Sequence, residues 1–457
     1  MPRIHGVETE YGLRARSVAV GVRGRLSPPE AAQLLFAPVE HDNASSNVFL
    51  RNGGRLYLDV GSHPEYATAE CRGVGDLLVQ ERAGDQIMDR LAARAEVWAA
   101  ERGRSVELRL FKNNVDSHHN SYGSHENYSL DRSLDLAEVA RLLTPFLVTR
   151  QLLCGSGRWT PEGFLISQRA DHVHDGLSPM TTRARPLINT RDEPLADPAR
   201  FRRLHVLAGD SNLSEPSAAL KIGSLGLVLD ALEAGRLPDL TLADPGRCVR
   251  DVARDPAAPL TLADGTTTSA VAVQRRYLEA VAVVPAITDA WAAVLDALAA
   301  GRPEVLEADV EWVAKRRLLE RFAARHHLSW GDRRLAQVDL AFHDITTDAD
   351  GAPRGLFRLL ERSGAVRRLT DPAAVDAAVS RPPADTRAVL RGRLIAAAQR
   401  HGRSYTVDWL DFAAHDVVTG PGATAEVAVR LPDPFATADP AAEALIQALE
   451  RGWQPPG

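Results

Sequence analysis

The sequence predicts an α+β fold with a small C-terminal appendage. Strand-like alternation dominates up to about residue 210, and helical periodicity dominates the stretch that follows. The two kinds of segment do not alternate regularly, so a doubly wound parallel sheet is not expected. A break at Arg381–Asp385, which contains two consecutive prolines, predicts a large domain, residues 1–383, and a small C-terminal domain, residues 384–457.

The composition is that of an ordinary globular protein of 457 residues, 45% hydrophobic and 25% charged. The net charge is -6 and basic residues do not interleave with aromatics, so nucleic acid is not an expected partner. No apolar run approaches the roughly 20 residues of a membrane span, so no membrane association is expected. The three cysteines, Cys71, Cys154 and Cys248, are widely scattered, which fits a cytoplasmic location.

The first predicted strand covers residues 3–14, where apolar and polar residues alternate between Gly6 and Gly12. Glu8 and Glu10 are two positions apart on this strand, so both carboxylates are expected on one face. Two solvated surface glutamates are the alternative, but the strand is otherwise apolar.

The remaining elements follow from periodicity and from capping signals. Ser27–Glu30 combines a capping box with proline at the first helical position, which predicts a helix through Phe36. Further helices are expected at 76–102, 136–153, 215–235, within 271–326, at 386–401 and at 439–451. Further strands are expected at 46–60 with a bend at 52–54, and at 106–111, 124–130, 163–168, 404–410 and 425–431, with a Gly/Pro loop between the last two.

The densest group of acids lies in the segment Ser45–Cys71, which contains Asp59, Glu65, Glu70 and His63. Carboxylates packed this closely repel one another unless cations lie between them. Hard oxygen ligands of this kind suit Mg²⁺, which usually reaches a protein together with the phosphates of a nucleotide. The sequence therefore suggests an enzyme that uses ATP and Mg²⁺.

Tyr57 and Asp59 share one face of a predicted strand, with Leu56 and Leu58 on the other. A carboxylate held on a stiff element among other acids is a candidate general base for a lysine amine or a water. The alternative is an aspartate at a strand end that makes only local turn bonds.

Two further polar segments suit phosphate or carboxylate recognition. His125 and Asn127 share a strand face and add no negative charge. Thr181–Arg185 and Arg191 offer guanidinium groups, which bind polyphosphates or carboxylates in a fork. A buried ion-pair network is the alternative for these arginines, and Gly155–Gly157 is interpreted as a plain turn.

Long, ordered motifs resemble the Pup ligase and depupylase family. They are Val7–Gly12, Ser45–Cys71, Phe111–Asn114, Ser121–Tyr128, Pro145–Gln151, Ile188–Pro194, Arg202–His205 and Gly209–Glu215. The similarity runs to about residue 220 and reappears in four short segments: Asp309–Lys315, Gln337–Ile345, Thr386–Gly392 and Tyr405–Trp409.

The resemblance implies a glutamine-synthetase-like catalytic domain in residues 1–383. There an antiparallel sheet, backed by helices, cradles ATP and Mg²⁺. It also implies the partners: Pup, a small and largely disordered ubiquitin-like protein, and lysine-bearing target proteins. A ligase of this family phosphorylates the C-terminal glutamate of Pup, and a target lysine then attacks to form an isopeptide bond. A depupylase hydrolyses that bond at the same site.

The resemblance also implies roles for individual residues. Glu8 is expected to bind magnesium, together with Tyr57 and Glu65, and Asp59 is expected to act as the catalytic base. Six further residues are expected to contact the nucleotide: Glu10, Glu70, His125, Asn127, Arg191 and His205.

The direction of the reaction is indicated by local features. Ser45–Cys71 is similar to ligases, and the segment before it is short where depupylases usually carry a long insertion. Asn114–Asp116 and Ser124–Asn127 look more like depupylases, and His415–Leu431 lacks the basic run usual in ligases. We expect a ligase, with a depupylase-like hydrolase or a nucleotide-binding regulator without turnover as the alternatives.

Arginine fills almost every basic position, and the lysines are Lys112, Lys221 and Lys315. Codon bias in a GC-rich genome explains such a count. A second hypothesis is that an enzyme that modifies lysines gains by offering few of its own.

Overall fold

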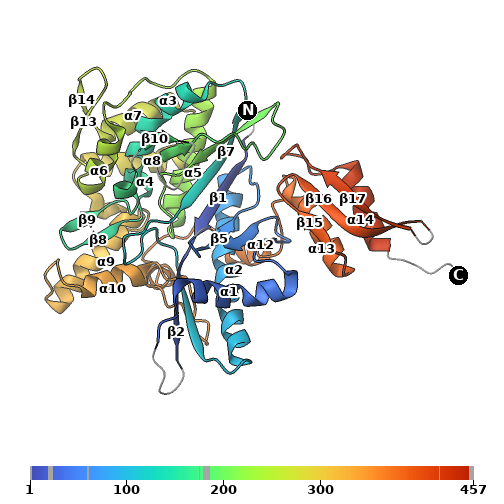
Figure 1. Ribbon diagram of the computed structural model, residues 1–457. Helices are drawn as coiled ribbons and strands as arrows, with labels where there is room; N and C mark the ends of the chain where they lie inside the picture. The colour runs from blue at the N-terminus through green and yellow to red at the C-terminus, as the bar shows by residue number, and fades with distance from the viewer. Residues whose placement is uncertain are drawn as a thin grey trace.

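The computed structural model describes residues 3–18, 24–58, 61–173, 175–178, 186–420 and 423–451. Figure 1 shows a central sheet, helices packed against it, and a C-terminal group of elements at one side. The strands are β1 (His5–Glu10), β2 (Gly12–Ser17), β3 (Val48–Phe49), β4 (Arg55–Leu58), β5 (Pro64–Ala67), β6 (Val106–Phe111), β7 (Ser124–Asp131), β8 (Arg158–Thr160), β9 (Gly163–Leu165), β10 (Asp175–Ser178), β11 (Pro186–Asn189), β12 (Phe201–Val206), β13 (Pro259–Thr261), β14 (Thr267–Ser269), β15 (Tyr405–Val407), β16 (Asp411–Gly420) and β17 (Ala423–Arg430).

The α-helices are α1 (Pro28–Asn43), α2 (Val74–Ala100), α3 (Leu136–Thr149), α4 (Gln151–Cys154), α5 (Glu215–Glu233), α6 (Pro245–Arg254), α7 (Ala270–Ala280), α8 (Pro285–Ala299), α9 (Glu311–His326), α10 (Arg334–Phe342), α11 (Leu356–Arg362), α12 (Pro372–Ala378), α13 (Ala388–Arg400) and α14 (Pro440–Arg451). None of the helices in the described ranges combines the length and apolar character that crossing a membrane would require.

The central sheet has eight strands in the order β10-β11-β12-β7-β1-β5-β4-β3. Its neighbouring strands run antiparallel, apart from the parallel pair β10 and β11. The expected α+β fold, an antiparallel sheet backed by helices with a small sheet near the C-terminus, is therefore confirmed. Strand β1 occupies the middle of the sheet, so its side chains are flanked on both sides by paired strands.

The first expected strand is in fact two strands that meet at Tyr11. The backbone N–H of Tyr11 donates to the carbonyl of Pro64, and after it β2 leaves the central sheet to pair with β6. Helix α1 begins where the Ser27–Glu30 capping box predicts, because the Glu30 carboxylate accepts the backbone N–H of Ser27 at 2.8 Å. It then continues seven residues past the expected end, through an internal proline, Pro38.

Several strands, β5, β8, β10, β13 and β14 among them, were not expected from the sequence, and neither were β11, β12 and β16. Strands β11 and β12 lie in segments that were interpreted only as polar motifs, and β16 lies in the expected Gly/Pro loop. Each is defined by pairing with a neighbour: β12 pairs with β7 through six consecutive residue partners, and β16 pairs with β17. Such pairing depends on tertiary structure more than on local propensity.

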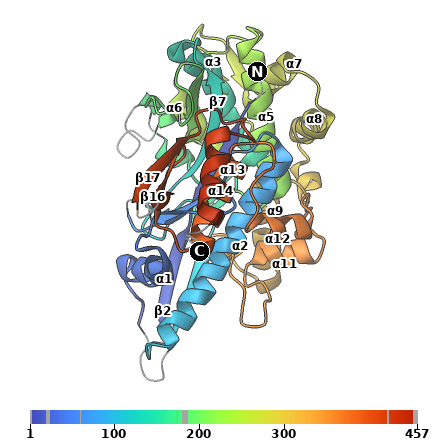
Figure 2. The same cartoon turned by 90° about the vertical axis from the view of Figure 1, so that its right-hand side faces the viewer.

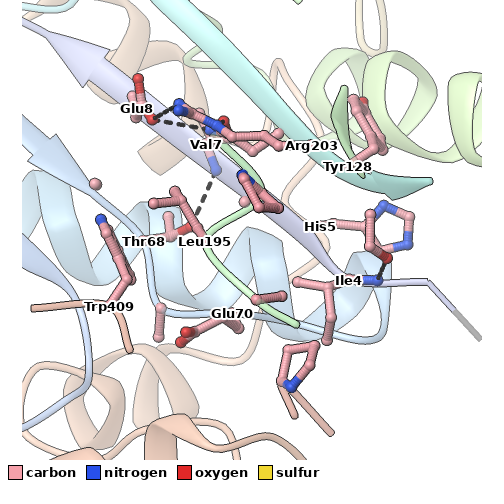
Figure 3. A pocket seen from close by; sticks show the side chains of 18 of the residues that line it. Ile4, His5, Val7, Glu8, Thr68, Glu70, Tyr128, Leu195, Arg203 and Trp409 are labelled. Carbon is pink, nitrogen blue, oxygen red and sulfur yellow. Dashed lines mark hydrogen bonds and ion pairs between the residues drawn. The ribbon is translucent and has the colours of Figure 1, made fainter. Parts of the chain in front are cut away.

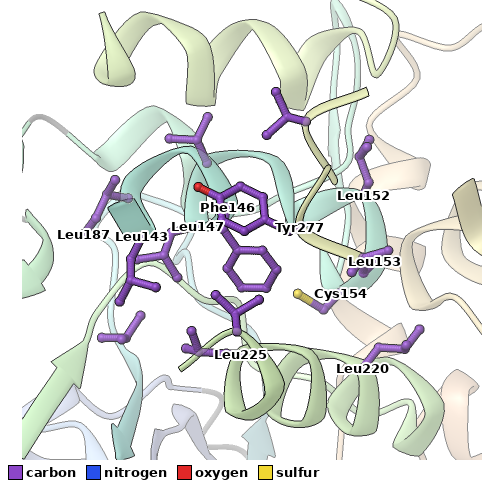
Figure 4. Packing of buried hydrophobic residues seen from close by; sticks show 14 of the residues in the cluster. Leu143, Phe146, Leu147, Leu152, Leu153, Cys154, Leu187, Leu220, Leu225 and Tyr277 are labelled. Carbon is purple, nitrogen blue, oxygen red and sulfur yellow. The ribbon is translucent and has the colours of Figure 1, made fainter. Parts of the chain in front are cut away.

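The largest hydrophobic core lies between the sheet and helices α3, α5, α7 and α8 (Figure 4). Phe146 is fully buried in it and makes edge-on ring contacts with Tyr277 and Trp291. The Tyr277 hydroxyl donates to the carbonyl of Leu142 at 2.6 Å, so its polar end is satisfied. This core supports the face of the sheet that carries Val7, opposite the face that carries Glu8.

Helices α13 and α14 and strands β15 to β17 form what we call the C-terminal unit. It has a hydrophobic core of its own, to which Phe49 of β3 also contributes. Figures 1 and 2 show the unit beside the central sheet and along α2. The unit therefore contacts the main body at β3, the edge strand of the central sheet, where Phe49 belongs to the core of the unit and Val48 packs against a second core of the main body.

All three lysines of the chain are buried. Lys112 forms ion pairs with Glu81 and Asp85 on α2. The other two lysine ammonium groups, of Lys221 and Lys315, donate to backbone carbonyls at 2.9 Å and 2.6 Å.

Candidate active site

One face of the central sheet carries rows of acidic and polar side chains from neighbouring strands. In one row, antiparallel pairing places Glu10 opposite Glu65, and Glu65 opposite Tyr57. In the next row, Glu8 lies opposite His125. Directly paired residues project to the same side of a sheet, so five strand positions far apart in sequence face one space.

A third row adds His205 opposite Asn127, with Arg203 two residues earlier on the same face of β12. Asn127 joins the rows, because its amide nitrogen donates to Glu8 at 3.0 Å and its amide oxygen accepts from Arg203 at 2.6 Å. The site therefore draws on β12, β7, β1, β5 and β4 without a break across the sheet.

Glu8 is the centre of this arrangement. Its carboxylate forms an ion pair with Arg203 at 2.9 Å and lies 3.2 Å from Nδ1 of His125 and 3.6 Å from Nε2 of His205. Burial by itself would raise the pKa of Glu8, but the Arg203 charge and the two histidines outweigh it. The pKa of Glu8 is held well below its usual range, so the carboxylate stays negative at neutral pH.

His205 is buried and uncharged at neutral pH. Burial lowers its pKa to about 4, although the nearby Glu8 carboxylate acts in the opposite direction. Its Nδ1 lies 3.2 Å from the amide nitrogen of Asn189, which can only donate. The ring proton is therefore assigned to Nε2, the atom that faces Glu8 and has no hydrogen-bond partner within 3.5 Å.

Tyr57 and Glu65 form a second contact in the same face. The Tyr57 hydroxyl donates a short hydrogen bond to the Glu65 carboxylate. Burial and the negative charges of Glu8 and Glu65 raise the pKa of Tyr57, so the phenol keeps its proton. The Arg55 guanidinium lies 4.4 Å from the centre of the Tyr57 ring and covers it.

Glu10 marks the other end of the site. It is buried, yet no described side chain hydrogen-bonds or ion-pairs with its carboxylate. Gly123 lies against it: a Cβ at this position would stand 2.5 Å from a Glu10 oxygen and 2.4 Å from Nε2 of His125. The absence of a side chain at Gly123 therefore lets both groups lie against its backbone.

An apolar pocket adjoins Glu8 on the side away from Glu10 (Figure 3). Its floor is the first half of β1 and the end of β5, and Trp409 and Leu195 lie across it. It is lined by Ile4, Val7, Ala67, Ala69, Pro194, Leu195, Ala196, Trp409 and Pro434, with Glu8 and Arg203 at one end. The pocket suits a flat, largely apolar group whose charged end points toward Glu8.

Glu70 lines the same pocket but is committed to other partners. Its carboxylate accepts from Nε of Arg387 at 2.8 Å and from Nη1 of Arg391 at 3.0 Å. Burial would raise the pKa of Glu70, but these two guanidinium groups lower it to about 2. Glu70 therefore ties helix α13 to the main body next to the pocket.

The other expected site residues do not all lie on this face of the described structure. Asp59 and the segment 181–185 lie outside the described residues. Arg191 is exposed. Its backbone N–H donates to the side chain of Asn189 at 3.0 Å, and Asn189 in turn contacts His205. The structure thus brings Glu8, Glu10, Glu65, Tyr57, His125, Asn127 and His205 to one face.

Arg203 and Asn189 were missed by the sequence reasoning. Arg203 neutralises Glu8, and Asn189 fixes the tautomer of His205. The sequence does contain a signal for Arg203. Arg203 and His205 are two positions apart, so on a strand both side chains would lie on the same face. It was not used because β12 was not predicted.

The donor groups present fit a hard divalent cation. In the part of the chain that the structure describes, Glu8 and His125 bring ligand atoms within 4.8 Å of each other, and His205 lies as close but turns its protonated Nε2 toward Glu8, so it would contact an anion and not the metal. The carboxylates of Glu65 and Glu10 lie on the same face. Carboxylate oxygens with open space beside them are the surroundings that Mg²⁺ prefers when it also binds substrate phosphates.

Comparisons with known proteins identify the family of this chain. Residues 3–413 match the family model described as Pup-ligase protein. The chain is 45% identical over 464 residues to a Pup–protein ligase of Actinosynnema mirum, covering 98% of this chain and 99% of the relative. It is also 45% identical to a Pup–protein ligase of Saccharomonospora viridis, with the same coverage.

Two solved structures are similar as well. The ligase PafA in complex with Pup has a TM-score of 0.89 and 41% identity, covering 99% of this chain and 93% of that one. PafA in complex with ADP has a TM-score of 0.82 and 42% identity, covering 94% of this chain and 95% of that one. These relatives are ligases, which favours ligation over hydrolysis or mere nucleotide binding. The protein belongs to the Pup-ligase family.

Proposed function

We propose that this protein uses ATP to join the C-terminal glutamate of Pup to a lysine of a target protein. The observation that carries the proposal is the continuous face on which Glu8, Glu10 and Glu65 adjoin Arg203, His205 and an apolar pocket. A chain of the Pup-ligase family with this face intact has the acids and the cations that phosphoryl transfer requires.

The direction of β1 orders the substrates along the site. Residues 4–8 line the pocket, which we assign to the base of ATP, and Glu8 stands where the pocket becomes charged. Glu10 is two residues, about 7 Å, further along the strand. We therefore place the γ-phosphate near Glu8, within reach of Glu10 and His125, the expected nucleotide contacts, and the glutamate of Pup beyond it on the same side.

Glu8 and Glu65 are the proposed direct ligands of Mg²⁺, and Tyr57 belongs to the metal site by orienting Glu65. When bound, Mg²⁺ would offset negative charge on the phosphates of ATP. The neighbouring Arg203 and the Nε2 proton of His205 are the proposed contacts to the transferred phosphoryl group. Asn127, Arg191 and Glu70 complete the proposed nucleotide environment, the last by holding Arg387 at the pocket.

The chemistry takes two steps. The γ-carboxylate of the Pup glutamate attacks the γ-phosphorus of ATP, forming an acyl phosphate and releasing ADP. The lysine amine then attacks the acyl carbon, the isopeptide bond forms, and phosphate leaves. A base must take the proton of the ammonium because only the neutral amine is a nucleophile. Asp59 is the proposed base, on the strength of its position in the Ser45–Cys71 motif.

A large groove lies between α1, α2 and β15, and we assign it to Pup. Its volume is about 1170 Å³, and its apolar lining includes Val48, Leu50 and Ile87. Arginines stand along it, among them Arg90 and Arg94. A disordered segment that folds into an amphipathic helix would bury its apolar face in such a groove and set acidic side chains against the arginines.

We further propose a division into a catalytic domain, residues 1–383, and a small domain, residues 384–457, and a cytoplasmic location. The separate core of the C-terminal unit supports the first. Three buried cysteines, none in a disulfide within the described residues, support the second.

A paired gel assay with ATP and Mg²⁺ tests the function. One reaction contains Pup ending in glutamate and a lysine-bearing acceptor, and the other contains a pre-formed Pup conjugate. A new, heavier band in the first reaction alone is expected. Loss of conjugate in the second reaction alone would identify a depupylase, and no change in either reaction would contradict both enzymatic functions.

Two variants separate the steps. Asp59→Asn should abolish the conjugate while hydroxylamine still traps the acyl phosphate as a hydroxamate. Glu8→Gln should abolish both products. Arg247→Gln, a change in an exposed i,i+4 ion pair on α6, serves as the control and should leave both products unchanged.

A further inference from the structure

A single guanidinium group joins three separate parts of the chain at the edge of the apolar pocket. Nε of Arg387 donates to the Glu70 carboxylate at 2.8 Å, Nη1 to the carbonyl of Leu431 at 2.8 Å, and Nη2 to the carbonyl of Leu195 at 2.5 Å. Arg387 is only 2% exposed. Because these bonds are buried, breaking one leaves a polar group without water to replace its partner.

The segment held by Nη2 has an unusual backbone. Leu195 has a φ of 48°, in the left-handed region that β-carbon sterics disfavour for leucine. Strained residues of this kind persist where the surrounding structure fixes them, and they are common at ligand clamps. Leu195 and Trp409 both line the pocket, so the strained residue is part of its lining (Figure 3).

The third segment also borders the pocket. Pro434 lines the pocket, and its carbonyl accepts the backbone N–H of Arg387 at 3.0 Å. The backbone N–H of Asp197 donates to the carbonyl of Pro432 at 2.9 Å, which joins the two covering segments directly. Residues 194–197 and 431–435 therefore form one cover, which we call the roof, and Arg387 bonds to both halves.

We propose that Arg387 is a positioning residue that locks the roof over the base of the bound nucleotide. This inference rests on the proposed function, since it takes the ligand of the pocket to be a nucleotide. Glu70 anchors the guanidinium to the sheet, and the guanidinium holds Leu195 and the C-terminal unit in place. Nucleotide binding and docking of the C-terminal unit are then coupled, because the same side chain serves both.

The test compares Arg387→Lys and Arg387→Met with Arg393→Met. Arg393 is on the same helix, and its ion-pair partner among the described residues is Glu443 at the surface. Lysine keeps the positive charge beside Glu70, so the Arg387→Lys chain should still fold. Its single ammonium group cannot reach all three acceptors as the guanidinium fork does. The dissociation constant of a fluorescent ATP analogue and hydrogen exchange of peptides 194–197 and 431–435 are measured for the full-length protein.

Arg387→Lys should weaken nucleotide binding about tenfold, and Arg387→Met should weaken it at least as much. Nucleotide should slow exchange in both roof peptides of the wild type and of Arg393→Met, but not in Arg387→Lys. If folded Arg387→Lys binds the analogue with wild-type affinity, and nucleotide still slows exchange in both roof peptides, the inference is wrong and the proposed function is unaffected. A wild type that binds no nucleotide would overturn the proposed function, and the inference with it.

Discussion

At the scale of single residues, Glu8 shows how the site keeps a buried carboxylate charged. Arg203, Asn127 and His125 all contact it, from two neighbouring strands. Hydrogen bonds and an opposite charge favour the ionised form more than burial opposes it, so the pKa falls. A carboxylate that stays negative can hold a cation while a phosphoryl group moves beside it.

Glu8→Gln is expected to preserve the fold and lower the rate of hydroxamate formation by about 100-fold or more. The amide keeps the shape of the side chain but removes the charge that balances Arg203 and the proposed cation. Single-turnover trapping with hydroxylamine measures the rate. A variant with the wild-type rate would show that Glu8 is not part of the reacting centre.

Gly123→Ala should lower the rate of conjugate formation by about tenfold or more while leaving the KM for ATP nearly unchanged. The added methyl group would stand within 2.5 Å of both Glu10 and His125, so one of them must move. The pocket lies on the other side of Glu8 and should not sense the change. Steady-state kinetics with varied ATP and varied Pup separate the two effects, and a raised KM for ATP would contradict this placement.

Glu70→Gln should destabilise the protein at neutral pH by about 3 kcal/mol. The folded-state pKa of Glu70, about 2, lies below its ordinary value of 4.5. This stabilisation is therefore fully present above pH 4.5 and is lost as the pH falls toward 2. Urea unfolding at pH 7 and at pH 3.5 measures the difference in unfolding free energy between wild type and Glu70→Gln, which should be smaller at pH 3.5. An equal difference at both pH values would argue against the lowered pKa of Glu70.

At the scale of elements, the site is a product of strand register. Alternation along β1 and β7 is visible in the sequence, so the shared face of Glu8 with Glu10, and of His125 with Asn127, was predictable. The Arg203–Glu8 ion pair spans 195 positions and depends on β12 pairing with β7. No local pattern encodes that pairing, which is why the fold class and the face of the acids could be predicted and the contact of Arg203 with Glu8 could not.

Helix α2 offers a test of the groove with two equivalent substitutions. Ile87→Asp places a charge in the apolar lining and should raise the KM for Pup about tenfold. Val97→Asp makes the same change at a position that is 59% exposed and outside the groove, so it should have no effect. Equal effects of the two substitutions would remove the groove from consideration as the Pup site.

At the scale of the whole molecule, the pocket is assembled from both ends of the chain. Strand β1 supplies its floor, and Trp409 and Pro434, from the C-terminal part of the chain, also line it. The C-terminal unit also shares its core with Phe49 of the central sheet. The two parts of the molecule are thus joined by buried contacts as well as by the ligand site.

Saturating ATP and Mg²⁺ should therefore shift the melting of the whole molecule together, by about 3 °C at 100 times the dissociation constant. A ligand that binds only the assembled pocket stabilises every part required to form it. Differential scanning calorimetry with and without nucleotide checks this. Two unfolding transitions, only one of which shifts to higher temperature with nucleotide, would mean that the C-terminal unit unfolds independently of the site.

The buried lysines have a consequence for anyone who studies this enzyme. Lys112, Lys221 and Lys315 are its full set of side-chain amines, and each is enclosed in ion pairs or hydrogen bonds. An amine-reactive ester should therefore label no lysine of the native protein and three after denaturation in urea. In a mixture with target proteins, no lysine of the native enzyme therefore competes for such reagents or for its own activated product. Every lysine adduct detected then reports on a target.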